Sequence, residues 1–187
     1  RRIPVLQLGA DIYCDTALMA DVLERLAPAP SLYPAHHKGL PRIVAQWADE
    51  KLFWAAMGYN FQGAADLFKG AGDAAAAQQA MQAFADDRSR MMNGMVRLRP
   101  GDATGAYRSY LRRIATLLED GQPFLLGDAP TMADLAAYGP LWFTRTRVPS
   151  MAGILDATPA VVPWMDRVAA IGHGRAQRIG AGEAIEA

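Results

Sequence analysis

The most diagnostic residues of this chain read Ile3-Pro4-Val5-Leu6-Gln7-Leu8-Gly9-Ala10-Asp11-Ile12-Tyr13-Cys14-Asp15-Thr16. Residues 3–8 are predicted to form a strand, Gly9-Ala10-Asp11 a three-residue hairpin connection, and residues 12–14 a second, antiparallel strand. Asp15 is a favourable N-cap for a helix from about Thr16 to Leu26, because its carboxylate can accept hydrogen bonds from unpaired backbone amides. Two strands do not form a stable unit alone. We therefore expect the hairpin to be the second part of a larger domain.

The bulk composition is that of an ordinary globular protein. The chain has 187 residues, of which 51% are hydrophobic and 20% are charged, so it can bury a sizeable core. Nineteen basic and nineteen acidic residues give no net charge, which argues against nucleic acid or an anionic membrane as the main partner. No apolar run approaches the ~20 residues that span a bilayer. A single cysteine excludes an internal disulfide framework and favours a reducing, cytoplasmic location.

The hydrophobic pattern divides the chain into three parts. Residues 1–27 hold the hairpin and its helix, residues 28–38 form a proline-rich linker, and residues 39–187 are predicted to be helical throughout. The predicted long helices are, in chain order, 41–68, 73–98 (stopped by Pro100-Gly101), 103–119, 131–144 and one that Thr158-Pro159 opens. The expected fold class is α+β and mostly α.

Two short motifs near the N-terminus are candidates for ligand binding. Pro4 can simply begin a strand, but a cis Ile3-Pro4 bond would leave the main-chain groups of Ile3 unpaired, and an extended peptide could bind to them. Asp15 can be only a helix cap. Alternatively, the Thr16 hydroxyl and the first helix amides bind a ligand carboxylate while Asp15 meets its ammonium group. The hairpin holds both motifs close together, which favours the functional interpretation of the pair.

At these residues the chain resembles the glutathione transferase family. The order of a hydrophobic residue, a cis-proline, a hairpin and an acidic-Ser/Thr pair is that of the second half of the family's thioredoxin-like domain. Two later segments resemble the family's helical domain: Pro123-Phe124-Leu125-Leu126-Gly127-Asp128-Ala129-Pro130-Thr131-Met132-Ala133-Asp134-Leu135, and Leu155-Asp156-Ala157-Thr158-Pro159-Ala160-Val161-Val162-Pro163-Trp164-Met165-Asp166-Arg167-Val168. The resemblance spans most of the chain, and the three segments come in the family's order.

The resemblance implies a fold and an activity. The fold would be part of a thioredoxin-like domain followed by the family's all-α domain. Glutathione would lie along Ile3-Pro4, with its γ-glutamyl end at Asp15-Thr16, and its thiol would attack a small hydrophobic electrophile in a detoxification reaction by a homodimer. The Ser, Tyr or Cys that activates the thiol is expected in a missing N-terminal segment, so no catalytic residue is named. Asp15 is shorter by one methylene than the Glu more usual in the family. The alternatives are a non-catalytic binding or assembly protein and a glutathione-dependent isomerase or reductase.

The first long helix carries an aromatic stripe that is a candidate acceptor pocket. Its members include Trp47, Glu50, Trp54 and Met57. The stripe can equally be core, whereas the family resemblance implies the acceptor pocket or a subunit interface. Because an unpaired buried carboxylate is costly, Glu50 should either reach a cation or line a wet cleft.

Four other residues or pairs receive structural interpretations. Thr131 and Asp134 are spaced as a capping box, a purely structural role. Cys14 lies beside the anionic Asp15, which disfavours a thiolate, so we expect a small buried filler. His36-His37 and His173 have no acid or cysteine at ligand spacing, so no metal site is predicted.

Overall fold

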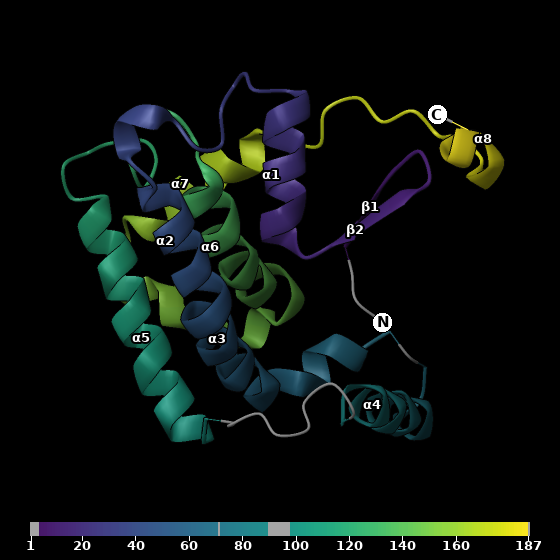
Figure 1. Ribbon diagram of the computed structural model, residues 1–187. Coiled ribbons are helices and arrows are strands. Elements are labelled where there is room, and N and C mark those ends of the chain that lie inside the picture. Colours follow the sequence, from purple (N-terminus) through teal and green to yellow (C-terminus); the bar gives the residue numbers. More distant parts are fainter. Residues whose placement is uncertain (1–3, 71, 90–97, 187) are drawn as a thin grey trace.

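The computed structural model describes residues 4–70, 72–89 and 98–186, so Ile3 and its bond to Pro4 lie outside the described residues. A two-stranded hairpin and one helix lie beside a bundle of helices (Figure 1). The predicted α+β, mostly α architecture is confirmed. None of the helices in the described part of the chain is both long and apolar enough to cross a bilayer.

The N-terminal hairpin forms as its sequence predicts, with a tighter turn. Strand β1 (Val5–Leu8) pairs antiparallel with β2 (Asp11–Cys14), and the register places Leu8 opposite Asp11. The connection is therefore Gly9-Ala10, and the prediction of a three-residue connection was wrong, because Asp11 joins the ladder. Helix α1 (Thr16–Leu26) follows, with Asp15 as its N-cap as predicted.

The first long helix changes its pitch along its length and is kinked at Gly63. It begins with α2 (Leu40–Trp47), widens into a π-helical turn, η2 (Ala48–Leu52), continues as α3 (Phe53–Asn60) and tightens into η3 (Phe61–Phe68). Gly63 leaves helical geometry inside η3, at φ −103° and ψ 26°. After it comes α4 (Ala74–Ser89), capped by Asp73 as predicted. The predicted extension of this helix to residue 98 runs into residues 90–97, which are not described.

The remaining helices complete the bundle. They are α5 (Pro100–Leu117), α6 (Met132–Trp142), the π-helical turn η4 (Phe143–Arg147), η5 (Pro149–Ala157), α7 (Val161–Ala170) and α8 (Ala181–Glu186), with the short η1 (Ala35–His37) in the linker. The predicted start of α5 at about Ala103 was wrong, because α5 already begins at Pro100. A proline fits there because its missing N–H has no partner in a first turn.

Small residues let the helices of the bundle approach closely. Ala48, Ala55 and Ala56 are wholly buried and face α5 and α6 in the main core. A Cβ added at Gly58 would lie 2.9 Å from Cβ of Ala103 on α5. The small side of the first long helix is therefore core, whereas parts of its aromatic side stay exposed, including Phe53 and Phe61.

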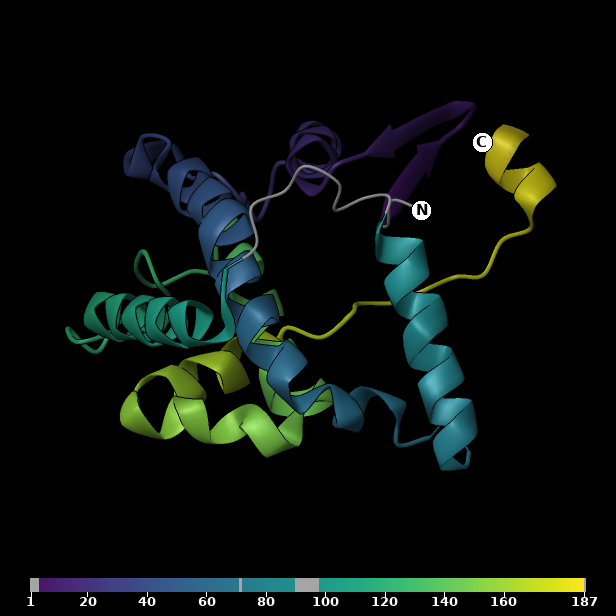
Figure 2. The same ribbon diagram turned by 90° about the horizontal axis from the view of Figure 1, so that it is seen from below.

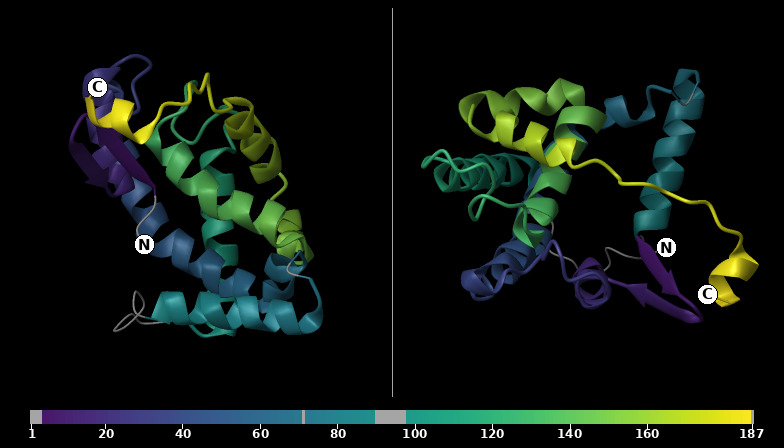
Figure 3. Two further views of the ribbon diagram at one scale, coloured as in Figure 1. Left: turned by 90° about the vertical axis from the view of Figure 1, so that its right-hand side faces the viewer. Right: turned by 90° about the horizontal axis from the view of Figure 1, so that it is seen from above.

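Two helices lie apart from this core. Helix α4 stands away from the bundle (Figure 2) and has no buried residue. Its Phe84 ring packs at 6.2 Å and 6.4 Å from the rings of Phe68 and Phe61. Helix α8 lies next to the hairpin, away from the bundle (Figure 3), where Gln7 Nε2 donates a 3.2 Å hydrogen bond to the carbonyl of Ala184.

Candidate functional site

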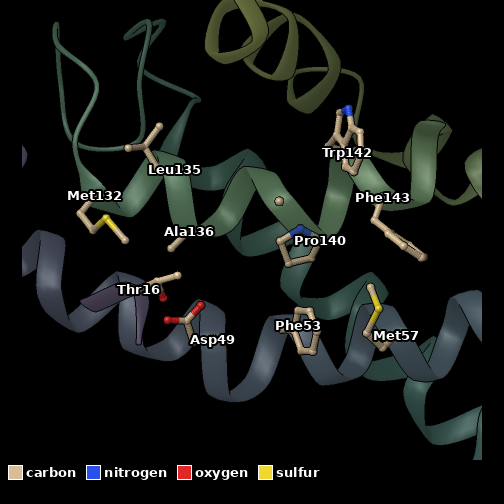
Figure 4. Close-up of a pocket in the computed structure, with 11 residues that line it drawn as sticks. Thr16, Asp49, Phe53, Met57, Met132, Leu135, Ala136, Pro140, Trp142 and Phe143 are labelled. Carbon is tan, nitrogen blue, oxygen red and sulfur yellow. The ribbon is translucent and has the colours of Figure 1, made fainter. Parts of the chain in front are cut away.

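A cavity of about 440 Å³ opens where α1 meets the helical bundle. One wall is the segment η2–α3, the other is α6 with η4, and the first residue of α1 lies between them (Figure 4). This size is within the range of small-molecule sites. The lining residues are Thr16, Asp49, Phe53, Met57, Met132, Leu135, Ala136, Gly139, Pro140, Trp142 and Phe143.

The cavity is polar at one end and apolar at the other. Figure 4 shows the Thr16 hydroxyl and the Asp49 carboxylate facing each other near Ala136, with Met57 and Phe143 at the opposite end. Among the described residues, the Thr16 hydroxyl makes no hydrogen bond, and its side chain is exposed. It is therefore available to a ligand.

Asp15 holds the start of α1 in place, and one of its two carboxylate oxygens is used for this. Its Oδ1 accepts hydrogen bonds from the amides of Ala17 (2.9 Å) and Leu18 (3.2 Å). The predicted cap is thus confirmed, and it occupies two of the first helix amides that the ligand-binding alternative would use. The Thr16 amide and hydroxyl remain, at the positive end of the helix dipole. Asp15 itself has φ 96°, a sparsely populated conformation of the kind that gathers at functional sites.

Asp49 is the site residue that the sequence analysis missed. The aromatic stripe was traced on a regular α-helix, but the π-helical turn at residues 48–52 widens the helix at this point. The residues that reach the cavity are Asp49, Phe53 and Met57, spaced four apart. The spacing of these residues was visible in the sequence. The π-helical turn that directs their side chains toward the cavity was not.

The predicted acceptor-pocket residues are only partly brought together. Met57 lines the cavity, whereas Trp47 packs edge-on against Tyr110 at 5.4 Å and Trp54 edge-on against Phe53 at 5.1 Å. Glu50 is exposed and accepts a 2.9 Å hydrogen bond from Gln46 Nε2, so it neither lines the cavity nor meets a cation there.

The polar end of the cavity has an acidic character. Burial raises the pKa of Asp49, and the negative charges of Asp15 and then Glu50 raise it further. Asp49 takes part in none of the ion pairs found among the described residues. Its carboxylate is thus suited to a hydrogen-bond donor or a positively charged group.

The remaining candidates lie outside the cavity. Pro4 is exposed just before β1, and the Ile3-Pro4 bond lies outside the described residues, so its predicted cis form stays a prediction. Cys14 is exposed, and the prediction of a buried filler was wrong: it sits at the open end of a two-stranded sheet, opposite the exposed Val5. The described residues contain no cluster of His, Cys, Asp and Glu that could hold a metal ion.

The capping box lies behind one wall of the cavity and is confirmed. The Thr131 hydroxyl accepts from the amide of Ala133 (3.3 Å), and Asp134 Oδ2 accepts from the amide of Thr131 (2.9 Å). Both side chains are buried. They fix the start of α6, whose next turns supply Leu135, Ala136 and Pro140 to the cavity.

Comparison with known proteins gives a consistent result. Residues 31–167 match the family described as "Glutathione S-transferase, C-terminal domain". A GST-like protein from Pseudomonas syringae is 31% identical, with a TM-score of 0.70 over 100% of this chain and 55% of that one. The chain therefore spans about half the length of that protein.

More distant structures share the fold. A glutathione S-transferase from Rhodospirillum rubrum F11 is 20% identical, with a TM-score of 0.57 over 90% of this chain and 66% of that one. One from Methylobacterium radiotolerans, solved in complex with glutathione sulfonate, is 20% identical, with a TM-score of 0.54 over 96% of this chain and 77% of that one. No curated protein matches the chain.

Proposed function

Because this chain belongs to the glutathione S-transferase family, we propose that its protein binds glutathione at the start of α1 and joins the glutathione thiol to a small hydrophobic electrophile. The sulfur forms a bond to the electrophilic carbon, and the leaving group departs with its electron pair. The observation that carries this proposal is the Thr16 hydroxyl at the helix N-terminus, which has no hydrogen-bond partner among the described residues and lies at the polar end of a mostly apolar cavity.

The γ-glutamyl end of glutathione would bind at Asp15 and Thr16. Its carboxylate would accept hydrogen bonds from the Thr16 hydroxyl and amide, where the helix dipole favours negative charge. Its ammonium group would face the Asp15 carboxylate, of which Oδ1 already caps the helix. The rest of the tripeptide would run along Ile3-Pro4 by strand-like hydrogen bonds.

The electrophile would occupy the apolar end of the cavity. Phe53, Met57, Trp142 and Phe143 line it, and methionine adapts its shape to different ligands. In this proposal residues 1–27 are part of the glutathione-binding domain, 28–38 a linker and 39–187 the helical domain, in a cytoplasmic homodimer. The group that activates the thiol would come from a part of the protein outside this chain.

The test is calorimetric titration of the full-length protein with glutathione. Thr16→Ala should weaken binding by at least about tenfold, the value of one hydrogen bond to a charged group, while Thr16→Ser should restore it. The matched control is Thr116→Ala, an exposed threonine on α5 away from the cavity. Asp15→Asn should also weaken binding, and thermal unfolding shows whether the cap persists.

The outcomes separate the candidate functions. An absence of binding, or binding unchanged by Thr16→Ala combined with Asp15→Asn, would remove the assignment. Binding without conjugation of any electrophile would instead indicate a binding or assembly protein that retains the fold. Product analysis would reveal a glutathione-dependent isomerase or reductase.

A further inference from the structure

The cavity that would hold the electrophile presents hydrogen-bond acceptors. Among the described residues that line the cavity, Asp49 is the one with a charged side chain, and none is Lys, Arg or His. The Thr16 hydroxyl can both donate and accept. The other lining side chains are apolar except for the indole N–H of Trp142, which points away from Phe53 and Met57 in Figure 4.

A second acceptor comes from the backbone of α6. Pro140 lies inside this helix and has no N–H, so the carbonyl of Ala136, four residues earlier, loses its ordinary helical partner. Ala136 and Pro140 both line the cavity, and Figure 4 shows them on the face of α6 that lies across from Asp49 and Phe53. The carbonyl oxygen of Ala136 thus keeps acceptor capacity in the helix that forms this wall.

The charged side chains around the polar end of the cavity are negative, and they come from two elements. The Asp15 carboxylate belongs to the start of α1, and Asp49 and Glu50 belong to η2. Burial raises the pKa of Asp49, and the nearby charges of Asp15 and then Glu50 raise it further. An anionic group placed here would meet like charges at short range, which costs free energy, whereas a cation or a neutral donor would be stabilised.

We propose that the electrophilic substrate is an aromatic molecule that carries a hydrogen-bond donor or a positive charge, and that Asp49 selects it over anionic analogues. This inference rests on the proposed function in one respect: it assumes that the cavity holds the second substrate. Aromatic rings would pack between Phe53 and Phe143, and the donor would reach the Asp49 carboxylate or the Ala136 carbonyl.

The experiment measures binding of three matched naphthalenes to the full-length protein by equilibrium dialysis at pH 7. They are 2-naphthylmethylamine, a cation, 2-naphthylmethanol, a neutral donor, and 2-naphthoate, an anion. Each is measured alone and with saturating S-methylglutathione, which lacks a reactive thiol. The variants are Asp49→Asn and the matched control Glu50→Gln, which removes the neighbouring charge from a side chain outside the cavity.

We expect the wild-type protein to bind the amine at least about tenfold more tightly than the naphthoate. Asp49→Asn should reduce this ratio to less than about threefold, whereas Glu50→Gln, which removes a charge outside the cavity, should lower the ratio much less. Equal binding of amine and naphthoate by the wild-type protein would overturn the inference. So would an Asp49→Asn variant that keeps the ratio but loses affinity for S-methylglutathione, because Asp49 would then belong to the glutathione end.

Failure of the proposed function gives a different pattern. If the amine binds through Asp49 but glutathione gives no heat in calorimetry, the glutathione assignment fails while the charge selection by the cavity stands.

Discussion

The indole nitrogen of Trp164 on α7 donates a 2.9 Å hydrogen bond to Oδ1 of Asp134, a wholly buried carboxylate at the start of α6. The same oxygen accepts from the amide of Leu125 at 2.8 Å, and Oδ2 accepts from the amide and hydroxyl of Thr131 at 2.9 and 3.1 Å. One carboxylate therefore joins α7, the loop before α6 and the α6 N-cap. It also holds the N-terminal end of α6 in place, and α6 forms one wall of the cavity.

Asp134→Asn should be strongly destabilising. The amide group that replaces one oxygen would face two donors, so two buried hydrogen bonds would be lost. We expect the free energy of unfolding to fall by about 3 kcal/mol, measured by urea denaturation. Asp128→Asn, on an exposed residue of the same loop, should change it by less than about 0.5 kcal/mol. Equal stability of the two variants would contradict this role of Asp134.

Thr131→Ala should have a smaller effect. It removes the side-chain cap of α6 and the hydrogen bond from the Thr131 hydroxyl to Asp134, but leaves the Asp134 bond to the Thr131 amide in place. The expected loss is about 1 kcal/mol, and Thr131→Ser should recover most of it. Chemical denaturation measures the stability, and glutathione affinity should not change if the role is structural. A large loss of affinity would show that the cap also shapes the site.

Two glycine substitutions should change stability in opposite directions. At Gly63 an added Cβ would lie 2.6 Å from Met151 Cγ and 2.7 Å from Val148 Cγ1, so Gly63→Ala should cost about 1–3 kcal/mol through overpacking. At Gly105, in the exposed middle of α5, an added Cβ meets nothing within 4 Å. Gly105→Ala should stabilise the protein by about 1 kcal/mol through helix propensity. Thermal unfolding compares both, and the same sign for both would contradict the packing argument.

The contribution of Asp66 to stability should be lost only in strong acid. Its carboxylate accepts from the Ser150 amide at 2.8 Å and pairs with Lys69, and these partners lower the pKa of Asp66 to about 2. The unfolded value is about 3.9, so this stabilisation is complete above about pH 4 and is lost as the pH falls towards 2. Asp66→Asn should remove that part of the acid dependence. An unchanged pH profile of stability between 4 and 2 would refute it.

Asp49 should reduce stability at neutral pH. Its pKa is raised in the folded state, first by burial and then by Asp15 and Glu50, so folding favours the protonated form. The charged form is therefore destabilising above the folded pKa, and this penalty fades as the pH falls to the unfolded value of about 3.9. Asp49→Asn should raise the melting temperature at pH 7 but not at pH 3.5. A stabilisation of equal size at both pH values would exclude the electrostatic cause.

The local signals in the sequence predicted the helix starts well. The Asp15 and Asp73 caps and the Thr131–Asp134 capping box were all identified, because each depends on residues only two or three positions apart. The start of α5 was placed at Ala103 instead of Pro100, since a proline can both follow one helix and begin the next, and nothing local distinguishes the two.

The site shows where such local reasoning ends. The amphipathic first long helix and the acidic-hydroxyl pair at the start of α1 were both identified from residues that are close together in the sequence. Asp49, rather than Glu50, reaches the cavity because the helix widens into a π turn where it packs against α6, and packing of this kind involves residues about ninety positions apart. For the same reason the four donors around Asp134, and the exposure of Cys14, depend on which elements lie alongside one another in space.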